Sequence, residues 1–209
     1  FAPPSSVPTR GRPLANFTFA LSYALSGMEP WGHHLLNLAI HTGSALLLLG
    51  VVRRTLQSPR LAPQMSDSAR SLSLAIALVW AVLPLLTQSV TYISQRTELL
   101  AAFFYLLTLY GFIRGAGTGR PAWFALAVVA CLLGALSKEV MATAPLVVLL
   151  YDRTYFAGGF RPALRRRWWF YGALALAWVV LAVLTHDLRL RGVGGNLGVS
   201  PAAYALTQT

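Results

Sequence analysis

The stretch HLLNLAIHTGSALLLLGVV, residues 34–52, contains no Asp, Glu, Lys or Arg and is followed directly by Arg53 and Arg54. A helix needs about 20 mainly apolar residues to cross a bilayer. Cations directly after such a stretch are typical of its cytoplasmic end. We therefore predict that residues 34–52 form a transmembrane helix that ends in the cytoplasm.

Further apolar segments follow this one, separated by short polar loops. They comprise residues 71–90, 98–113, 121–136, 140–151 and 168–185. The segment 140–151 is short, so it is either a tilted half-span or a helix buried inside the bundle. The chain is 56% hydrophobic and 11% charged, whereas soluble domains have about 25% charged residues. The sequence predicts an all-α protein, a polytopic transmembrane helix bundle with about six membrane segments.

The distribution of charge predicts the orientation of this bundle. If every segment crosses, the loops on the side of Arg53 and Arg54 have eleven cations and two acids, a net charge of +9. The other side has six cations and four acids, a net charge of +2. We predict an integral protein of a bacterial inner membrane, with the loops of Arg53/Arg54, Arg114/Arg120 and Arg165–Arg167 in the cytoplasm. This placement explains the net charge of +11, so no nucleic-acid partner is expected.

A separate amphipathic helix is expected ahead of the first span, over residues 13–30. Pro13 suits the first helical position and Gly27 suits the stop. Its apolar face, at spacings of three and four, consists of Leu14, Phe17, Leu21, Leu25 and Met28. We predict that this helix lies at the membrane interface, after an external coil over residues 1–12. The bundle then occupies residues 31–187, and residues 188–209 form an external loop of an incomplete domain. Because Phe1 is not an initiator Met, we expect a longer natural polypeptide.

Two charged turns lie on the predicted external side. Gln95-Arg96-Thr97-Glu98 precedes one apolar segment, and Ser137-Lys138-Glu139 precedes another. Charges this close to hydrocarbon are costly unless they are paired or solvated. In one interpretation, Arg96–Glu98 and Lys138–Glu139 are ion pairs that only cap helices. In the other, the two turns form a pocket for a phosphate, with help from a helix N-terminus.

His34, Asn37 and His41 form a polar stripe on one helix face, at spacings of three and four. Histidines can bind metal, but no acid or cysteine shares their segment. A buried stripe that hydrogen-bonds to neighbouring helices is the better interpretation, so no metal site is predicted. A transporter that uses the stripe is a weaker alternative, because the charges lie at the membrane boundaries and not near the midplane. The single cysteine, Cys131, is expected in the core.

Three blocks of sequence resemble a known family. They are RPL (12–14) with LSYALSG (21–27), PWGHHL (30–35), Asn37 and His41; SVTYISQRTELL (89–100); and LSKE (136–139) with LLYD (149–152). In this order and spacing they resemble the membrane domain of GT-C glycosyltransferases that carry tetratricopeptide repeats. That family includes bacterial proteins and animal protein O-mannosyltransferases. The similarity extends from about Arg12 to Asp187.

The resemblance implies transfer of a sugar from a polyprenyl- or dolichyl-phosphate carrier to an acceptor hydroxyl on the external face. Arg96 and Lys138 occupy matching motif positions and would stabilise the departing lipid phosphate. Glu98 and Glu139 would orient them, and they are the candidate catalytic carboxylates of an inverting hexosyltransferase. The donor would be a substrate carrying a mannose-like hexose, and the acceptor a protein or a glycan. The resemblance leaves a need for divalent metal open.

One departure from the family's pattern supports an alternative. Members usually have His-Pro-Leu-x-Thr-Glu where this chain has Leu83-Pro84-Leu85-Leu86-Thr87-Gln88, so both the His and the last Glu are replaced. The family also usually has an earlier span and an external loop with the catalytic acid. The alternative is a non-catalytic descendant of GT-C enzymes, a scaffold whose partners are other subunits of a larger membrane complex.

Overall fold

The computed structural model describes residues 12–190, and in this range it consists of helices joined by short turns. The α-helices are α1 Pro13–Ser26, α2 Pro30–Leu56, α3 Ala62–Met65, α4 Ala69–Ala81, α5 Thr87–Thr91, α6 Arg96–Thr118, α7 Pro121–Ala135, α8 Ala144–Asp152, α9 Phe160–Arg166 and α10 Trp168–Leu190. Within the described range there are also three short 3₁₀ helices, η1 Pro84–Leu86, η2 Ile93–Gln95 and η3 Glu139–Thr143, and a π-helical turn, η4 Arg153–Ala157. The predicted all-α class is confirmed for these residues.

Proline and glycine set several helix ends. Pro13, Pro30 and Pro121 each open a helix, where the missing N–H of proline costs nothing. Gly27 and Gly119 follow the last residues of α1 and α6 with positive φ angles of 59° and 70°, which only glycine adopts readily. The helix predicted from Pro13 therefore begins at Pro13 and stops before Gly27.

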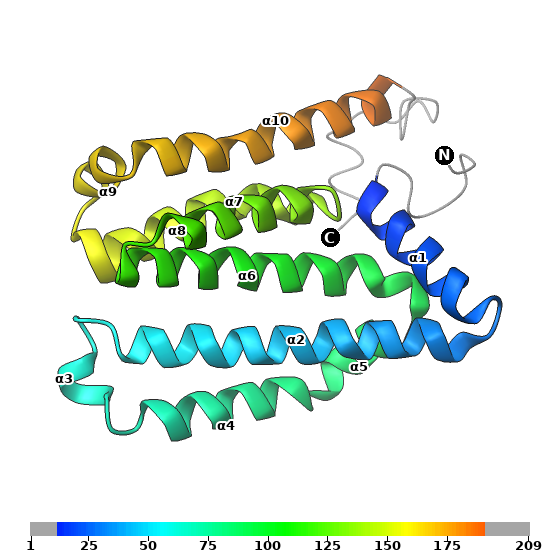
Figure 1. The fold of residues 1–209 in the computed structure, drawn as a ribbon, viewed down its shortest axis with the longest axis horizontal. Coiled ribbons are helices and arrows are strands. Elements are labelled where there is room, and N and C mark those ends of the chain that lie inside the picture. Colours follow the sequence, from blue (N-terminus) through cyan, green and yellow to red (C-terminus); the bar gives the residue numbers. More distant parts are fainter. Residues whose placement is uncertain (1–11, 191–209) are drawn as a thin grey trace, which may run out of the picture.

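The long helices lie side by side along the longest axis of the molecule (Figure 1). Helix α6 packs against both α2 and α7, α4 packs against the other side of α2, and α10 packs against α7. Consecutive long helices run in opposite directions. Helix α1 lies obliquely at one end, beside the starts of α2 and α6, whereas α3 and α9 lie at the opposite end (Figure 1).

A cluster of aromatic and small side chains fills the space between α6, α7, α8 and α10. The rings of Phe112 and Phe170 stack at 5.6 Å, and Phe124 meets Phe170 edge to face at 5.1 Å. Met141 and Cys131 are fully buried in the same cluster, so the cysteine occupies the core position expected of it.

Among residues 12–190, two helices are long and apolar enough to cross a membrane. They are Pro30–Leu56 and the combined helix Ile93–Thr118, and a third crossing results if the bent pair α9 and α10 forms one span. These helices support a membrane protein, but the count of six crossings stays a prediction. Helix α4 ends at Ala81, just before Pro84, which cannot supply a backbone donor. Helices α7 and α8 have 15 and 9 residues.

The charge pattern maps onto the two ends of the bundle. Arg53 and Arg54 lie in the last turn of α2, and Arg165 and Arg166 lie in the last turn of α9, at the same end in Figure 1. Which side of the membrane this end faces stays a prediction. The predicted coil over residues 1–11 lies outside the described residues. Helix α10 continues past residue 188, where a loop was expected, and residues 191–209 lie outside the described part.

Candidate functional site

The two charged turns that the sequence singles out meet at the end of the bundle opposite the arginine-rich loops. Lys138 Nζ donates a hydrogen bond to Glu98 Oε1, forming an ion pair between the turn after α7 and the first turn of α6. The Lys138 side chain is 26% exposed and that of Glu98 is 42% exposed. The pair is therefore open to water and to any ligand that reaches this end.

A second ion pair joins the start of α1 to the same place. Arg12 Nη2 lies 3.5 Å from Glu139 Oε2, and Arg12 Nη1 donates to Thr97 Oγ1 at 3.4 Å. The backbone N–H of Leu14 also donates to the carbonyl of Leu136 at 3.4 Å. Helix α1 thus contacts both charged turns, and this end of the bundle has two ion pairs, Arg12–Glu139 and Lys138–Glu98.

These pairs differ from the pairs within each turn that one interpretation of the sequence expects. Arg96 and Glu98 are two positions apart at the start of α6, and side chains with this spacing do not face each other on a helix. Lys138 is extended, with φ −160° and ψ 149°, and Glu139 begins a 3₁₀ turn. The two neighbours therefore meet different partners, and the ion pairs connect separate segments.

The two ion pairs Lys138–Glu98 and Arg12–Glu139 form a charged surface at this end of the bundle. Arg96 lies beneath this charged surface and is fully buried, with 0% of the residue exposed. Its Nε donates to Asn37 Oδ1 at 2.8 Å. One terminal nitrogen donates to the carbonyl of Thr18 at 3.0 Å and to Ser22 Oγ at 2.8 Å. The other donates to the carbonyl of His33 at 3.0 Å. A buried cation is tolerated only when its donors are satisfied in this way.

The environment of Arg96 is neutral and aromatic. Its guanidinium lies 4.4 Å from the centre of the Phe19 ring, a favourable cation–π arrangement. The three ion pairs that the structure describes do not include it. Its hydrogen bonds join α1, α2 and α6, so Arg96 fixes the position of the helix that contributes Arg12 to the charged surface.

Two residues of the polar stripe on α2, Asn37 and His41, contact different neighbours. Asn37 accepts from Arg96 and also donates to the carbonyl of Val90 at 3.4 Å. His41 Nε2 lies 2.9 Å from the carbonyl of Ala81, and its ring stacks on Trp80 at 5.0 Å. His34 is half-buried. Among residues 12–190, no three His, Cys, Asp or Glu side chains gather as metal ligands do.

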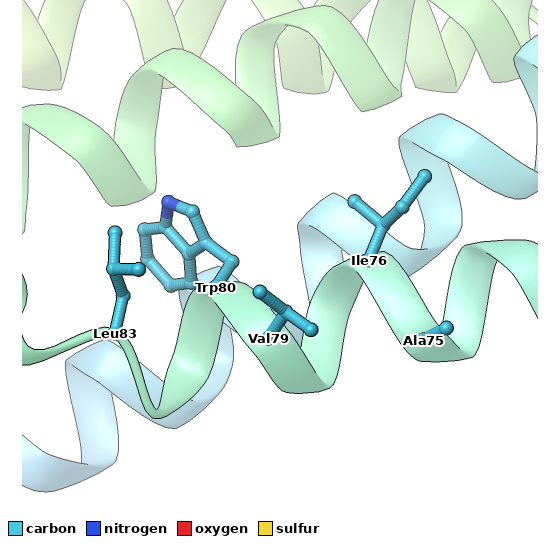
Figure 2. A pocket seen from close by; sticks show the side chains of 5 residues that line it. All are labelled: Ala75, Ile76, Val79, Trp80 and Leu83. Atoms are coloured by element: carbon cyan, nitrogen blue, oxygen red, sulfur yellow. The ribbon is translucent and has the colours of Figure 1, made fainter.

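The divergent segment Leu83–Gln88 occupies the short helices η1 and α5. Leu83 lines an open apolar groove on α4 together with Trp80 and Val79 (Figure 2). Gln88 is exposed in α5. Leu83, where the resemblance implies a histidine, therefore belongs to an apolar surface.

Sequence patterns did not single out three residues that the structure places in or directly under this site. They are Arg12, Ser22 and His33. Each lies within a block on which the family resemblance depends, as Asn37 and Arg96 do. In the structure these blocks pack against one another. Membership of the blocks was therefore the feature of the sequence that could have indicated these three residues.

Comparisons with known proteins agree with the resemblance. The chain is 30% identical to human protein O-mannosyl-transferase TMTC3 over 152 residues, which is 71% of the chain and 15% of that protein. It is 31% identical to Drosophila melanogaster Tmtc3 over 157 residues, with 68% of the chain and 17% of that protein covered. It is 33% identical to Drosophila melanogaster Tmtc2 over 148 residues, 68% of the chain and 15% of that protein.

No family model and no solved structure matches the chain. The aligned part spans about one sixth of the length of these curated relatives. The resemblance predicted from the sequence blocks is confirmed, because more than two thirds of this chain is similar to a segment of the protein O-mannosyl-transferases named TMTC.

Proposed function

We propose that this chain is part of a membrane glycosyltransferase of the GT-C type. In this proposal, it transfers a mannose-like hexose from a polyprenyl-phosphate carrier to a hydroxyl group of a protein or glycan on the external face. The similarity to proteins named protein O-mannosyl-transferases supports the reaction class. The proposal includes a bacterial inner membrane and cytoplasmic arginine-rich loops, in agreement with the charge distribution.

The observation that carries the proposal is the exposed Lys138–Glu98 pair beside the Arg12–Glu139 pair. A lipid phosphate at this end would compete with the two carboxylates for the two cations. Charge-assisted hydrogen bonds to phosphate are stronger than neutral ones, and cations placed where negative charge develops stabilise the departing group. We assign this role to Lys138 and Arg12.

The predicted direct contact between Arg96 and the phosphate stays a prediction. Each guanidinium nitrogen of Arg96 already donates to a protein acceptor, so a direct contact would require α1 or α2 to give up hydrogen bonds. We therefore assign to Arg96 a positioning role, in which it holds α1 so that Arg12 lies beside Glu139.

Glu98 and Glu139 remain the candidate general bases in this chain. In an inverting transfer, the acceptor oxygen attacks the anomeric carbon and the bond from that carbon to the phosphate oxygen breaks. The lipid phosphate leaves with the bonding electrons, and the acceptor's proton passes to a carboxylate. A carboxylate that a phosphate has displaced from its cation is suited to accept that proton.

A second candidate function is a non-catalytic membrane scaffold within a larger complex. The segment Leu83–Gln88 favours it, because the two polar residues expected there are replaced and Leu83 lines an apolar groove. This candidate predicts copurification at fixed stoichiometry with other membrane proteins and no transfer of sugar.

The test uses the full natural protein in phosphatidylcholine nanodiscs, with radiolabelled polyprenyl-phosphate mannose and an acceptor protein extract. The proposal expects label transfer that falls at least tenfold in Lys138→Ala, the scale on which a lost electrostatic contact acts in the transition state. The matched control is Arg120→Ala, which removes one exposed cation from the opposite end. Absence of transfer by the unchanged protein, with stable copurifying subunits, supports the scaffold instead.

A further inference from the structure

The three consecutive arginines before α10 have different surroundings. Arg167 is buried, and its Nη1 donates to both oxygens of Asp152 at 2.6 and 2.8 Å. Tyr171 Oη donates to the same carboxylate at 2.7 Å. Arg165 and Arg166 are exposed, and none of the ion pairs described for residues 12–190 includes them. Within residues 12–190, Arg167 is therefore the one of the three arginines that forms an ion pair.

The buried arginine lies at a sharp corner of the chain. Helix α9 and helix α10 meet at 93°, and Arg167 connects them. The Arg167–Asp152 ion pair connects this corner to α8. The Arg167 guanidinium also lies 5.7 Å from the centre of the Phe112 ring in α6. These two contacts fix the direction of α9 relative to the bundle. If α10 crosses the membrane, α9 lies in the plane of the membrane surface at the arginine-rich end (Figure 1).

The exposed face of α9 has the composition of an interfacial helix. Phe160 and Leu164 are four residues apart and exposed, and Trp168 at the corner is 73% exposed. Arg161 and Arg165 have the same spacing one position further along, so a cationic row lies next to an apolar row. Amphipathic helices of this kind bind membranes through the apolar face and through attraction of their arginines to anionic lipids.

We propose that α9 and the corner at Trp168 bind the headgroups of anionic phospholipids at the membrane surface. Arg161, Arg165 and Arg166 contact the lipid phosphates, while Phe160, Leu164 and Trp168 enter the boundary of the acyl chains. Charge complementarity selects an anionic leaflet over a zwitterionic one, because each arginine near such a surface contributes about 1 kcal/mol, or about fivefold in affinity. This inference is independent of the transferase reaction.

Thermal unfolding in detergent tests the proposal. Phosphatidylglycerol or phosphatidylcholine is added to the purified full-length protein, and Tm is measured against lipid concentration. Phosphatidylglycerol is expected to raise Tm at lower concentration than phosphatidylcholine does. The double variant R165Q/R166Q is expected to need on the order of 30-fold more phosphatidylglycerol for the same shift. The matched control R70Q/R120Q removes two exposed arginines of the same end and is expected to behave like the unchanged protein.

Equal responses to the two lipids overturn the proposal, and so does an equal loss in the two double variants, which indicates only general charge attraction. A spin label gives an independent measurement if R165Q/R166Q does not fold. In a variant with Cys131→Ala, a label at Leu164→Cys is expected to be accessible to membrane-dissolved oxygen and shielded from aqueous nickel. A label at Thr118→Cys serves as the water-exposed control. Equal nickel accessibility at the two positions contradicts an interfacial α9.

Discussion

Arg96 donates from Nε to the side-chain oxygen of Asn37 at 2.8 Å, and both residues are completely buried. The bond joins the first turn of α6 to the middle of the polar stripe on α2. The buried guanidinium of Arg96 thus lies next to a neutral acceptor. The centre of the Phe19 ring is 4.4 Å from the same guanidinium. The stability of this end of the bundle therefore depends on hydrogen bonds to one guanidinium group.

Replacing Asn37 by alanine tests this dependence. Asn37→Ala leaves the Nε donor of a buried cation without its acceptor, and we expect the free energy of unfolding to fall by about 1.5–3 kcal/mol. The matched control is Thr42→Ala, at an exposed position of the same helix, which we expect to change it by less than about 0.5 kcal/mol. Denaturation in mixed detergent micelles measures both. Equal effects of the two substitutions would show that the bond contributes little.

The buried ion pair at the opposite end predicts a larger effect. Asp152→Ala leaves both Arg167 and the hydroxyl of Tyr171 without their shared acceptor. Breaking a buried pair by removing one partner typically costs about 3–5 kcal/mol. Arg166→Ala, next to Arg167 in sequence but exposed, is expected to be nearly neutral for unfolding. A similar loss of stability in the two variants would contradict the different roles assigned to these arginines.

The close approach of α6 and α7 gives a third prediction. A Cβ atom on Gly111 would lie 3.0 Å from the carbonyl oxygen of Trp123 and 3.1 Å from Ala127 Cβ. Gly111→Leu must push the helices apart, and we expect a cost of about 1–3 kcal/mol. Gly117→Ala on the same helix meets nothing within 4 Å and should stabilise the protein by about 0.5–1 kcal/mol. Thermal unfolding that ranks the two variants in the opposite order would argue against this packing.

The sequence predicted the helical class and several helix ends because these depend on local features. Apolar runs, Pro13 and Gly27 indicate them without knowledge of the tertiary contacts. One of the two interpretations of the sequence brings the turns of Glu98 and Lys138 together. This proximity follows from the antiparallel packing of α6 and α7, because the start of α6 and the end of α7 then lie at the same end of the bundle.

The partners across those turns could not be predicted. Side chains that are neighbours in sequence point apart, so Lys138 pairs with Glu98 and Glu139 pairs with Arg12. The burial of Arg96 was equally hidden, because Ser22 and His33 reach it from other helices. The number of crossings depends on where a helix such as α4 stops, and an apolar run that continues beyond Ala81 does not show that point.

At the charged surface beside α1, we expect Lys138→Ala to weaken ligand binding without lowering the stability of the fold. The Lys138–Glu98 pair is partly exposed, and such pairs contribute only about 0–1 kcal/mol to stability. Lys138→Ala is therefore expected to keep the unfolding midpoint close to that of the unchanged protein. A large loss of stability in Lys138→Ala would show that the Lys138–Glu98 pair is structural. It would contradict a role of Lys138 in ligand contact alone.

A lipid-phosphate site at the two charged turns is tested by measuring the binding of polyprenyl phosphate to the full-length protein in phosphatidylcholine nanodiscs. Such a site predicts saturable binding that weakens at least tenfold in Lys138→Ala, as expected when one charge-assisted contact worth about 1.5–3 kcal/mol is removed. It also predicts unchanged affinity in Arg120→Ala, which lies at the opposite end. Equal affinity in Lys138→Ala and the unchanged protein, or no saturable binding at all, would contradict a lipid-phosphate site at these turns.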